Sequence, residues 1–150
     1  MGGRSSKLVP VGATSVTIEA IGEGKVTALA AELKANTTLT SLSCAYNGIG
    51  GAGSVAMADA LKTSTTLKSL ILRHNCFGDI GAVAMAEALR VVPLTSLDFS
   101  ANGIYDVGAA ALAAALRVNT SLTSLQLAYN NIGPALHRPL RKRCTQAPRH

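Results

Sequence analysis

The fold is decided by one phrase that recurs four times: LTSLSCAYN at residues 39–47, LKSLILRHN at 67–75, LTSLDFSAN at 94–102 and LTSLQLAYN at 122–130. Each copy ends in an asparagine, and the spacings between successive copies are 28, 27 and 28 residues: Asn47, Asn75, Asn102 and Asn130. A fixed period of this length indicates units that stack along an axis and contact only their neighbours. The chain is therefore predicted to be a solenoid, whose long open surface suits binding.

Each unit is predicted to contain a strand, a turn and a helix. Leu70 and Leu72 alternate with Ile71 and Arg73, so the leucines are expected to point inward and the other two outward, as in a short strand. A glycine-containing turn follows. An alanine-rich stretch comes next, and its apolar residues recur four apart, as on one face of a helix: Met57/Leu61, Met85/Leu89 and Leu112/Leu116.

The pattern LxxLxLxxN, followed by a glycine turn and a helix, resembles the leucine-rich repeat in its ribonuclease-inhibitor-like class. The resemblance covers residues 11–136 and implies an α/β solenoid of five units, with a parallel sheet on the concave side and helices on the convex side. It also implies that the protein works by binding other macromolecules. The first unit, residues 11–35, is worn, and Glu19 stands where the later units have asparagine.

Two segments lie outside the repeats. Residues 1–10 match no unit and are expected to be disordered or a remnant of cloning. Residues 137–150 are expected to form a basic tail and a partial cap, because most of the net charge of +6 lies there. The tail has no aromatic residue to stack on bases, so nucleic acid is not expected as a partner. No apolar run is long enough to predict a membrane-spanning helix.

Three features of the sequence could suggest a chemical site, and none of them predicts one. Gly48, Gly50 and Gly53 spell the dinucleotide fingerprint GxGxxG, but the other units carry the same turn with fewer glycines, and no acid follows at the required distance. The run 74–76 (His-Asn-Cys) holds residue types of a thiol hydrolase, but consecutive residues leaving a strand diverge. The cysteines lack metal-ligand spacing: Cys44, Cys76 and Cys144. No catalytic residue, cofactor or metal site is expected.

The four asparagines are interpreted as scaffold, because an asparagine at each strand end can satisfy turn backbone groups of its own unit and of an adjacent unit. The candidate binding site is instead the variable part of the concave face: Tyr46, Ile71, Arg73, His74, Asp98, Gln126 and Tyr129. Arg and Tyr are common contact residues at interfaces. Two alternatives stay open: Arg73 and Asp98 can pair with each other, and the variety can be drift on a solvated sheet.

The resulting hypothesis is a non-catalytic protein–protein interaction scaffold that binds an unidentified protein through the concave sheet. One alternative is a regulator of another enzyme, such as a GTPase activator. Another is a structural module that assembles as a homo-oligomer. A cytoplasmic location is expected, because the N-terminus lacks a signal peptide and the cysteines form no disulfide framework. Gly2 fits the N-myristoylation motif, and membrane association is expected only if it is acylated.

Overall fold

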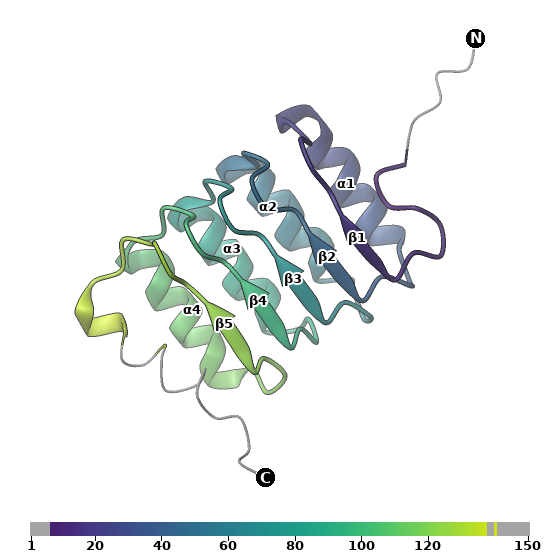
Figure 1. Cartoon of the computed structure of the whole chain (residues 1–150). Helices are drawn as coiled ribbons and strands as arrows, with labels where there is room; N and C mark the ends of the chain where they lie inside the picture. Colours follow the sequence, from purple (N-terminus) through teal and green to yellow (C-terminus); the bar gives the residue numbers. More distant parts are fainter. Residues whose placement is uncertain (1–6, 138–139, 141–150) are drawn as a thin grey trace.

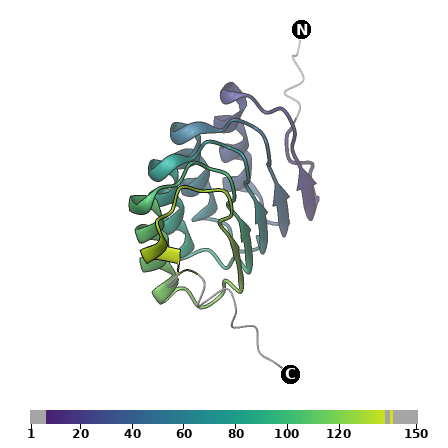
Figure 2. The same ribbon diagram turned by 60° about the vertical axis from the view of Figure 1, so that its left-hand side comes forward.

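The computed structural model describes residues 7–137 and 140 as a single stack of strand–helix units. Their order along the chain is β1 (Ser15–Thr17), α1 (Glu23–Ala35), β2 (Ser41–Ser43), α2 (Gly50–Leu61), β3 (Ser69–Ile71), α3 (Gly78–Leu89), β4 (Ser96–Asp98), α4 (Asp106–Val118) and β5 (Ser124–Gln126). The strands form one parallel sheet in sequence order (Figure 1). All four helices cover one side of it and leave the other side open (Figure 2). The predicted α/β solenoid is confirmed.

The strands pair so that equivalent residues lie side by side in rows that cross the sheet. The middle row points toward the helices and is apolar: Val16, Leu42, Leu70, Leu97 and Leu125. The row before it is serine in every strand: Ser15, Ser41, Ser69, Ser96 and Ser124. The row after it differs in every strand: Thr17, Ser43, Ile71, Asp98 and Gln126. The open face therefore carries one constant row and one variable row.

The core is the layer between the sheet and the helices. It contains the predicted inward residues, and Leu70 and Leu72 are both fully buried. The rings of Phe77 and Phe99 meet there with centroids 5.0 Å apart. At the far end Leu136 packs against the core and Leu140 is buried. Both leucines thus belong to the packed part of the last unit, and the partial cap stays a prediction.

The first unit departs from the sequence alignment. Ser15 pairs with Ser41, which is only 26 residues later, so the strand register of this unit differs from the 28-residue spacing of its helix. The backbone N–H of Ile21 donates to Asn47 Oδ1 at 2.8 Å, as the N–H of Asn47 does to Asn75 Oδ1 at 2.9 Å. The turn between strand and helix is thus two residues shorter here. The expectation that Glu19 replaces the asparagine was wrong, because Ile21 takes that place: it follows Ala20, whose φ of 53° matches that of the residue before each asparagine.

Two aspartates cap helices of the unit that follows their own. Asp79 lies in the first turn of α3, and its Oδ1 accepts from the N–H of Tyr105 at 2.8 Å and of Gly108 at 2.9 Å, at the start of α4. Asp106 in the same way accepts from the N–H of Gly133 at 2.7 Å. The negative charge also complements the positive end of a helix dipole. These carboxylates therefore join neighbouring units.

Glycines set the distance between adjacent helices. A Cβ on Gly81 would lie 2.7 Å from Phe77 Cβ and 2.5 Å from Ser54 Oγ, and one on Gly108 would lie 2.7 Å from Ala82 Cβ. Both gaps are too small for a methyl group. Gly51 differs, because its nearest neighbour would be the Phe77 carbonyl oxygen at 3.9 Å. Only some of the glycines near the starts of the helices are therefore required by packing.

The two kinds of glycine should respond to alanine in opposite directions. Gly81→Ala is expected to lower the free energy of unfolding by about 1–3 kcal/mol, because the helices must move apart to admit the methyl group. Gly51→Ala is expected to raise it by about 0.4–1 kcal/mol, because alanine restricts the unfolded chain without a clash. Urea denaturation of both variants measures this. Equal effects of the two substitutions would contradict the packing role of Gly81.

Candidate functional site

The open face of the sheet, with the turn residues that follow its strands, holds all seven predicted contact residues. We call this surface the sheet face. Ile71, Asp98 and Gln126 lie directly beside one another in the variable row. Tyr46 and His74 occupy equivalent positions in adjacent units, and Tyr129 lies two units beyond His74. Ser100, an outward position by its alternation with Asp98, is instead buried.

Three of these side chains form a cluster, which we call the Arg73 cluster: Tyr46, Arg73 and His74. The rings of Tyr46 and His74 stack with centroids 4.4 Å apart and an angle of 13° between their planes. The Arg73 guanidinium carbon lies 5.4 Å from the centroid of the Tyr46 ring, within the range of a cation–π contact. Tyr46 is 61% exposed in spite of these contacts. The cluster is therefore an ordered group of large side chains at the surface.

The backbone of the turn explains why these rings meet. Tyr46 and His74 have φ angles of 59° and 57°, and the equivalent Ala101 and Tyr129 have 52° and 58°. Residues other than glycine seldom adopt this left-handed conformation, which costs on the order of 1 kcal/mol each. Its recurrence places the residue before each asparagine in the same orientation in successive units. Two aromatic residues at this position in adjacent units are thereby brought into contact.

Arg73 and Asp98 do not pair. Among residues 7–137 and 140, the salt bridges are Lys62–Asp59 at 3.0 Å and Arg90–Glu87 at 3.6 Å, and both lie on the helix side. Asp98 Oδ1 instead accepts from the backbone N–H of Ser100 at 3.1 Å. The alternative in which Arg73 and Asp98 form an ion pair was wrong: Arg73 contacts the Tyr46 ring, and Asp98 accepts from the backbone of its own strand end.

The four repeated asparagines form a series that we call the ladder, and the side chain of each one connects two units. Asn75 Nδ2 donates to the carbonyls of Cys44, in the preceding unit, at 2.8 Å and of Leu72 at 2.9 Å. Its Oδ1 accepts from the backbone N–H of Asn47 at 2.9 Å. Asn102 and Asn130 repeat this arrangement, accepting from the N–H of the asparagine before them at 3.0 and 2.9 Å. Asn75 is fully buried, and its polar atoms are used within the chain.

The thiol hydrolase constellation does not form. Asn75 is engaged by backbone groups, while His74 lies against Tyr46. Besides Cys76, the structure describes one further cysteine, Cys44. Burial raises the pKa of the Cys44 thiol to about 12, so its thiolate is absent at neutral pH. Within the described part of the chain, no group of three or more His, Cys, Asp or Glu residues can hold a metal ion. Cys144 and Gly2 lie outside the described residues.

The glycines of the dinucleotide fingerprint have structural roles. Gly48 and Gly50 have φ angles of 59° and 71°, which the turn requires, and a Cβ on Gly53 would lie 2.8 Å from Ile49 Cγ2. A hollow of about 280 Å³ lies beside them, but no charged residue lines it. A pyrophosphate would find no cationic side chain there.

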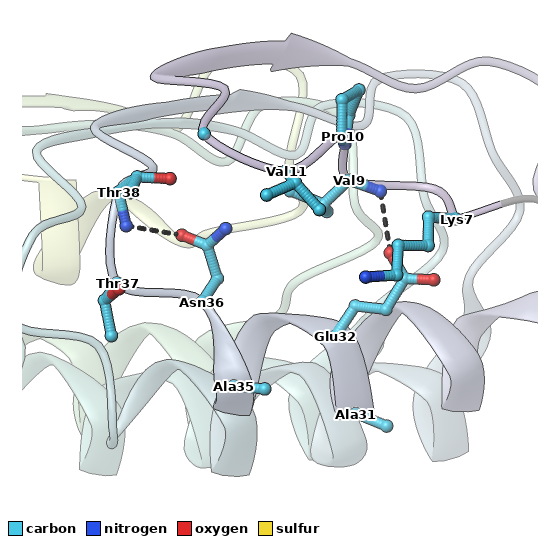
Figure 3. Close-up of a pocket in the computed structure, with 11 residues that line it drawn as sticks. Lys7, Val9, Pro10, Val11, Ala31, Glu32, Ala35, Asn36, Thr37 and Thr38 are labelled. Atoms are coloured by element: carbon cyan, nitrogen blue, oxygen red, sulfur yellow. Dashed lines mark hydrogen bonds between the residues drawn. The ribbon is translucent and has the colours of Figure 1, made fainter.

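A larger hollow of about 420 Å³ lies at the first unit, between α1 and the segment that precedes β1 (Figure 3). Glu32 accepts from the N–H of Leu8 at 3.1 Å and of Val9 at 2.7 Å. Asn36 Oδ1 accepts from the N–H of Thr38 at 3.0 Å, so it is engaged as well (Figure 3). Glu32 therefore fastens the segment before β1 to α1, while Asn36 closes the turn after that helix. They do not converge on a vacant position.

Sequence reasoning missed the features that depend on contacts between units. It placed Arg73, His74 and Tyr46 on one surface but gave no reason for them to touch, because their contact depends on the left-handed turn. That turn has no signal in the residue types, which are Tyr, His, Ala and Tyr in successive units.

No helix in the described part of the chain is long and apolar enough to span a membrane.

Comparison with known proteins agrees with this architecture. A family model described as "Leucine Rich repeat" matches residues 35–58, 63–86, 93–113 and 118–135, which together make up more than half of the chain. No curated protein sequence matches significantly. Among solved structures, one titled "Leiomodin-1 Actin-Binding Site 2 (ABS2)" superposes with a TM-score of 0.77 at 23% identity, covering 89% of this chain and 79% of that one. This likeness concerns the fold.

The ladder can be tested by removing one buried rung. Asn75→Ala is expected to lower the free energy of unfolding by about 3 kcal/mol or more, because several buried backbone groups lose their partners at once. Asn131→Ala is the matched control, since Asn131 is an exposed asparagine next to the ladder. Its effect should stay within about 0.5 kcal/mol. A loss below about 1 kcal/mol for Asn75→Ala in urea denaturation would contradict a structural role for the ladder.

Proposed function

The chain belongs to the leucine-rich repeat family, and from that premise we propose that it is a non-catalytic scaffold that binds a protein partner through the sheet face. Proteins built from such repeats generally serve as interaction scaffolds, because stacked units present an extended surface. Residues 11–136 would form the binding domain.

The observation that carries the proposal is the Arg73 cluster. The other outward positions of the strands are mostly small or polar, and the serine row offers little contact area. The cluster adds two stacked rings and a guanidinium, and the half-buried Ile71 lies two residues before Arg73 on the same strand face. Tyr and Arg are enriched among residues that dominate binding energy, since they bury large areas and donate hydrogen bonds. A rigid group of this kind suits an interface centre.

The superposed structure supports a protein partner for this fold. Its title names an actin-binding site, and actin is a protein. At 23% identity the match does not identify actin as the partner of this chain. A cytoplasmic location stays part of the proposal, as does membrane association if Gly2 is acylated. No contact described above favours the GTPase activator or the assembly module over the scaffold.

Affinity capture from native lysate tests the proposal. The sheet-face variant changes Arg73, His74, Asp98 and Gln126 to alanine. The matched helix-face variant changes Val83, Glu87, Arg90 and Val107 to alanine, four exposed residues that also include one acid and one guanidinium. Proteins captured by the wild type should persist with the helix-face variant and fall about tenfold or more with the sheet-face variant. Circular dichroism confirms that both variants are folded.

Two results of this capture experiment would contradict binding through the sheet face. If every captured protein persists with the sheet-face variant, the partner binds elsewhere and the proposal fails. Loss with the helix-face variant alone would move the binding surface to the helices.

A further inference from the structure

We infer that the segment recognised by the Arg73 cluster is an acidic peptide, which presents an Asp or Glu carboxylate to the Arg73 guanidinium beside an apolar side chain. This inference rests on the proposed function and specifies the chemistry of the partner. It draws on the hydrogen-bonding state of Arg73, on the charges of the sheet face and on the position of Ile71.

The Arg73 guanidinium is held in place but has no acceptor within the described residues. Its contact there is the Tyr46 ring, at 5.4 Å from the ring centroid, and Tyr46 is itself held by the stack with His74. A guanidinium carries five N–H donors in a planar fork that matches a carboxylate. Because the ring already restricts the side chain, less conformational entropy is lost when a ligand binds. The cluster is therefore preorganised for an anion.

The charge of the site favours a single carboxylate over a phosphate. Arg73 is the one Lys or Arg among the outward strand positions and the residues before the asparagines, within the part of the chain that the structure describes. Lys68, which precedes β3, donates through Nζ to the Pro93 carbonyl at 3.3 Å. A phosphate group carries nearly two negative charges, and sites for it often combine several cations. One guanidinium matches the single charge of Asp or Glu.

Neighbouring residues define what stands beside the carboxylate. Ile71 is a half-buried apolar residue on the same strand face as Arg73, and the exposed Tyr46 ring adds apolar area. Asp98 pairs with Ile71 in the sheet register, so a second acid placed there would meet a like charge. The peptide is thus expected to place its acid over Arg73, an apolar residue over Ile71 and no acid over Asp98.

A peptide selection tests the inference directly. A phage library of random twelve-residue peptides is selected on the immobilised wild-type protein. The recovered peptides are synthesised with a fluorophore, and their affinities are measured by fluorescence polarisation. We expect enrichment of Asp or Glu next to an apolar residue. Arg73→Gln should weaken binding by about tenfold or more, and so should replacement of the peptide acid by its amide.

Further variants separate charge from shape. Arg73→Gln and the amide replacement in the peptide should not be additive when combined, because both remove the same interaction. Asp98→Asn should raise the affinity, since it removes a like charge. Tyr46→Ala should weaken binding, while Tyr46→Phe should keep it, because the ring supports the guanidinium. The helix-face variant should bind as the wild type does.

The outcomes distinguish the inference from the proposed function. Peptides that bind the wild type, fail to bind the sheet-face variant and are indifferent to Arg73→Gln would overturn the acidic-peptide inference and leave the proposed function intact. Peptides that bind the sheet-face variant as tightly as the wild type would contradict both. A selection that yields no peptide with a preference for the wild type over the sheet-face variant would also contradict both.

Discussion

The structure depends on one hydrogen-bonding arrangement, in which an asparagine side chain after each of the strands β2 to β5 joins its own turn to the turn of the preceding unit. The strands have only three residues each, so the sheet ladder is short. Beyond it, the chain turns back toward the helices while still buried, and its amide and carbonyl groups need partners. Asn75 supplies them through both ends of its amide group. Within the described part of the chain, no buried side-chain nitrogen or oxygen lacks a hydrogen bond.

The same turn creates the candidate site. Each asparagine of the ladder is preceded by a residue in the left-handed conformation, and that residue differs between units: Tyr46, His74, Ala101 and Tyr129. Tyr46 and His74 occupy this position in adjacent units, so the scaffold itself brings their rings together. Arg73, which directly precedes His74 in the chain, completes the cluster through its contact with the Tyr46 ring. Scaffold and recognition surface are thus consecutive residues of one repeated turn.

The repeat period made the strands, the helices and the inward leucines predictable, because each depends on local spacing within a unit. The positions of the four ladder asparagines were predictable for the same reason. Three features were not predictable, since they depend on contacts between units. The shortened first turn, which puts Ile21 and not Glu19 in the place of the asparagine, is revealed by the pairing of Ser15 with Ser41. Asp79 caps the next helix and not its own, and Arg73 contacts Tyr46 and not Asp98, which only the three-dimensional arrangement decides.

Native-state hydrogen exchange tests the central role of the ladder most directly. The backbone N–H groups of Asn75 and Asn102 donate to the side chains of Asn102 and Asn130. If these bonds hold the units together, both amides should exchange only through global unfolding, with the same free energy as the most protected strand amides. Exchange through local opening, orders of magnitude faster than that of the strands, would contradict the account.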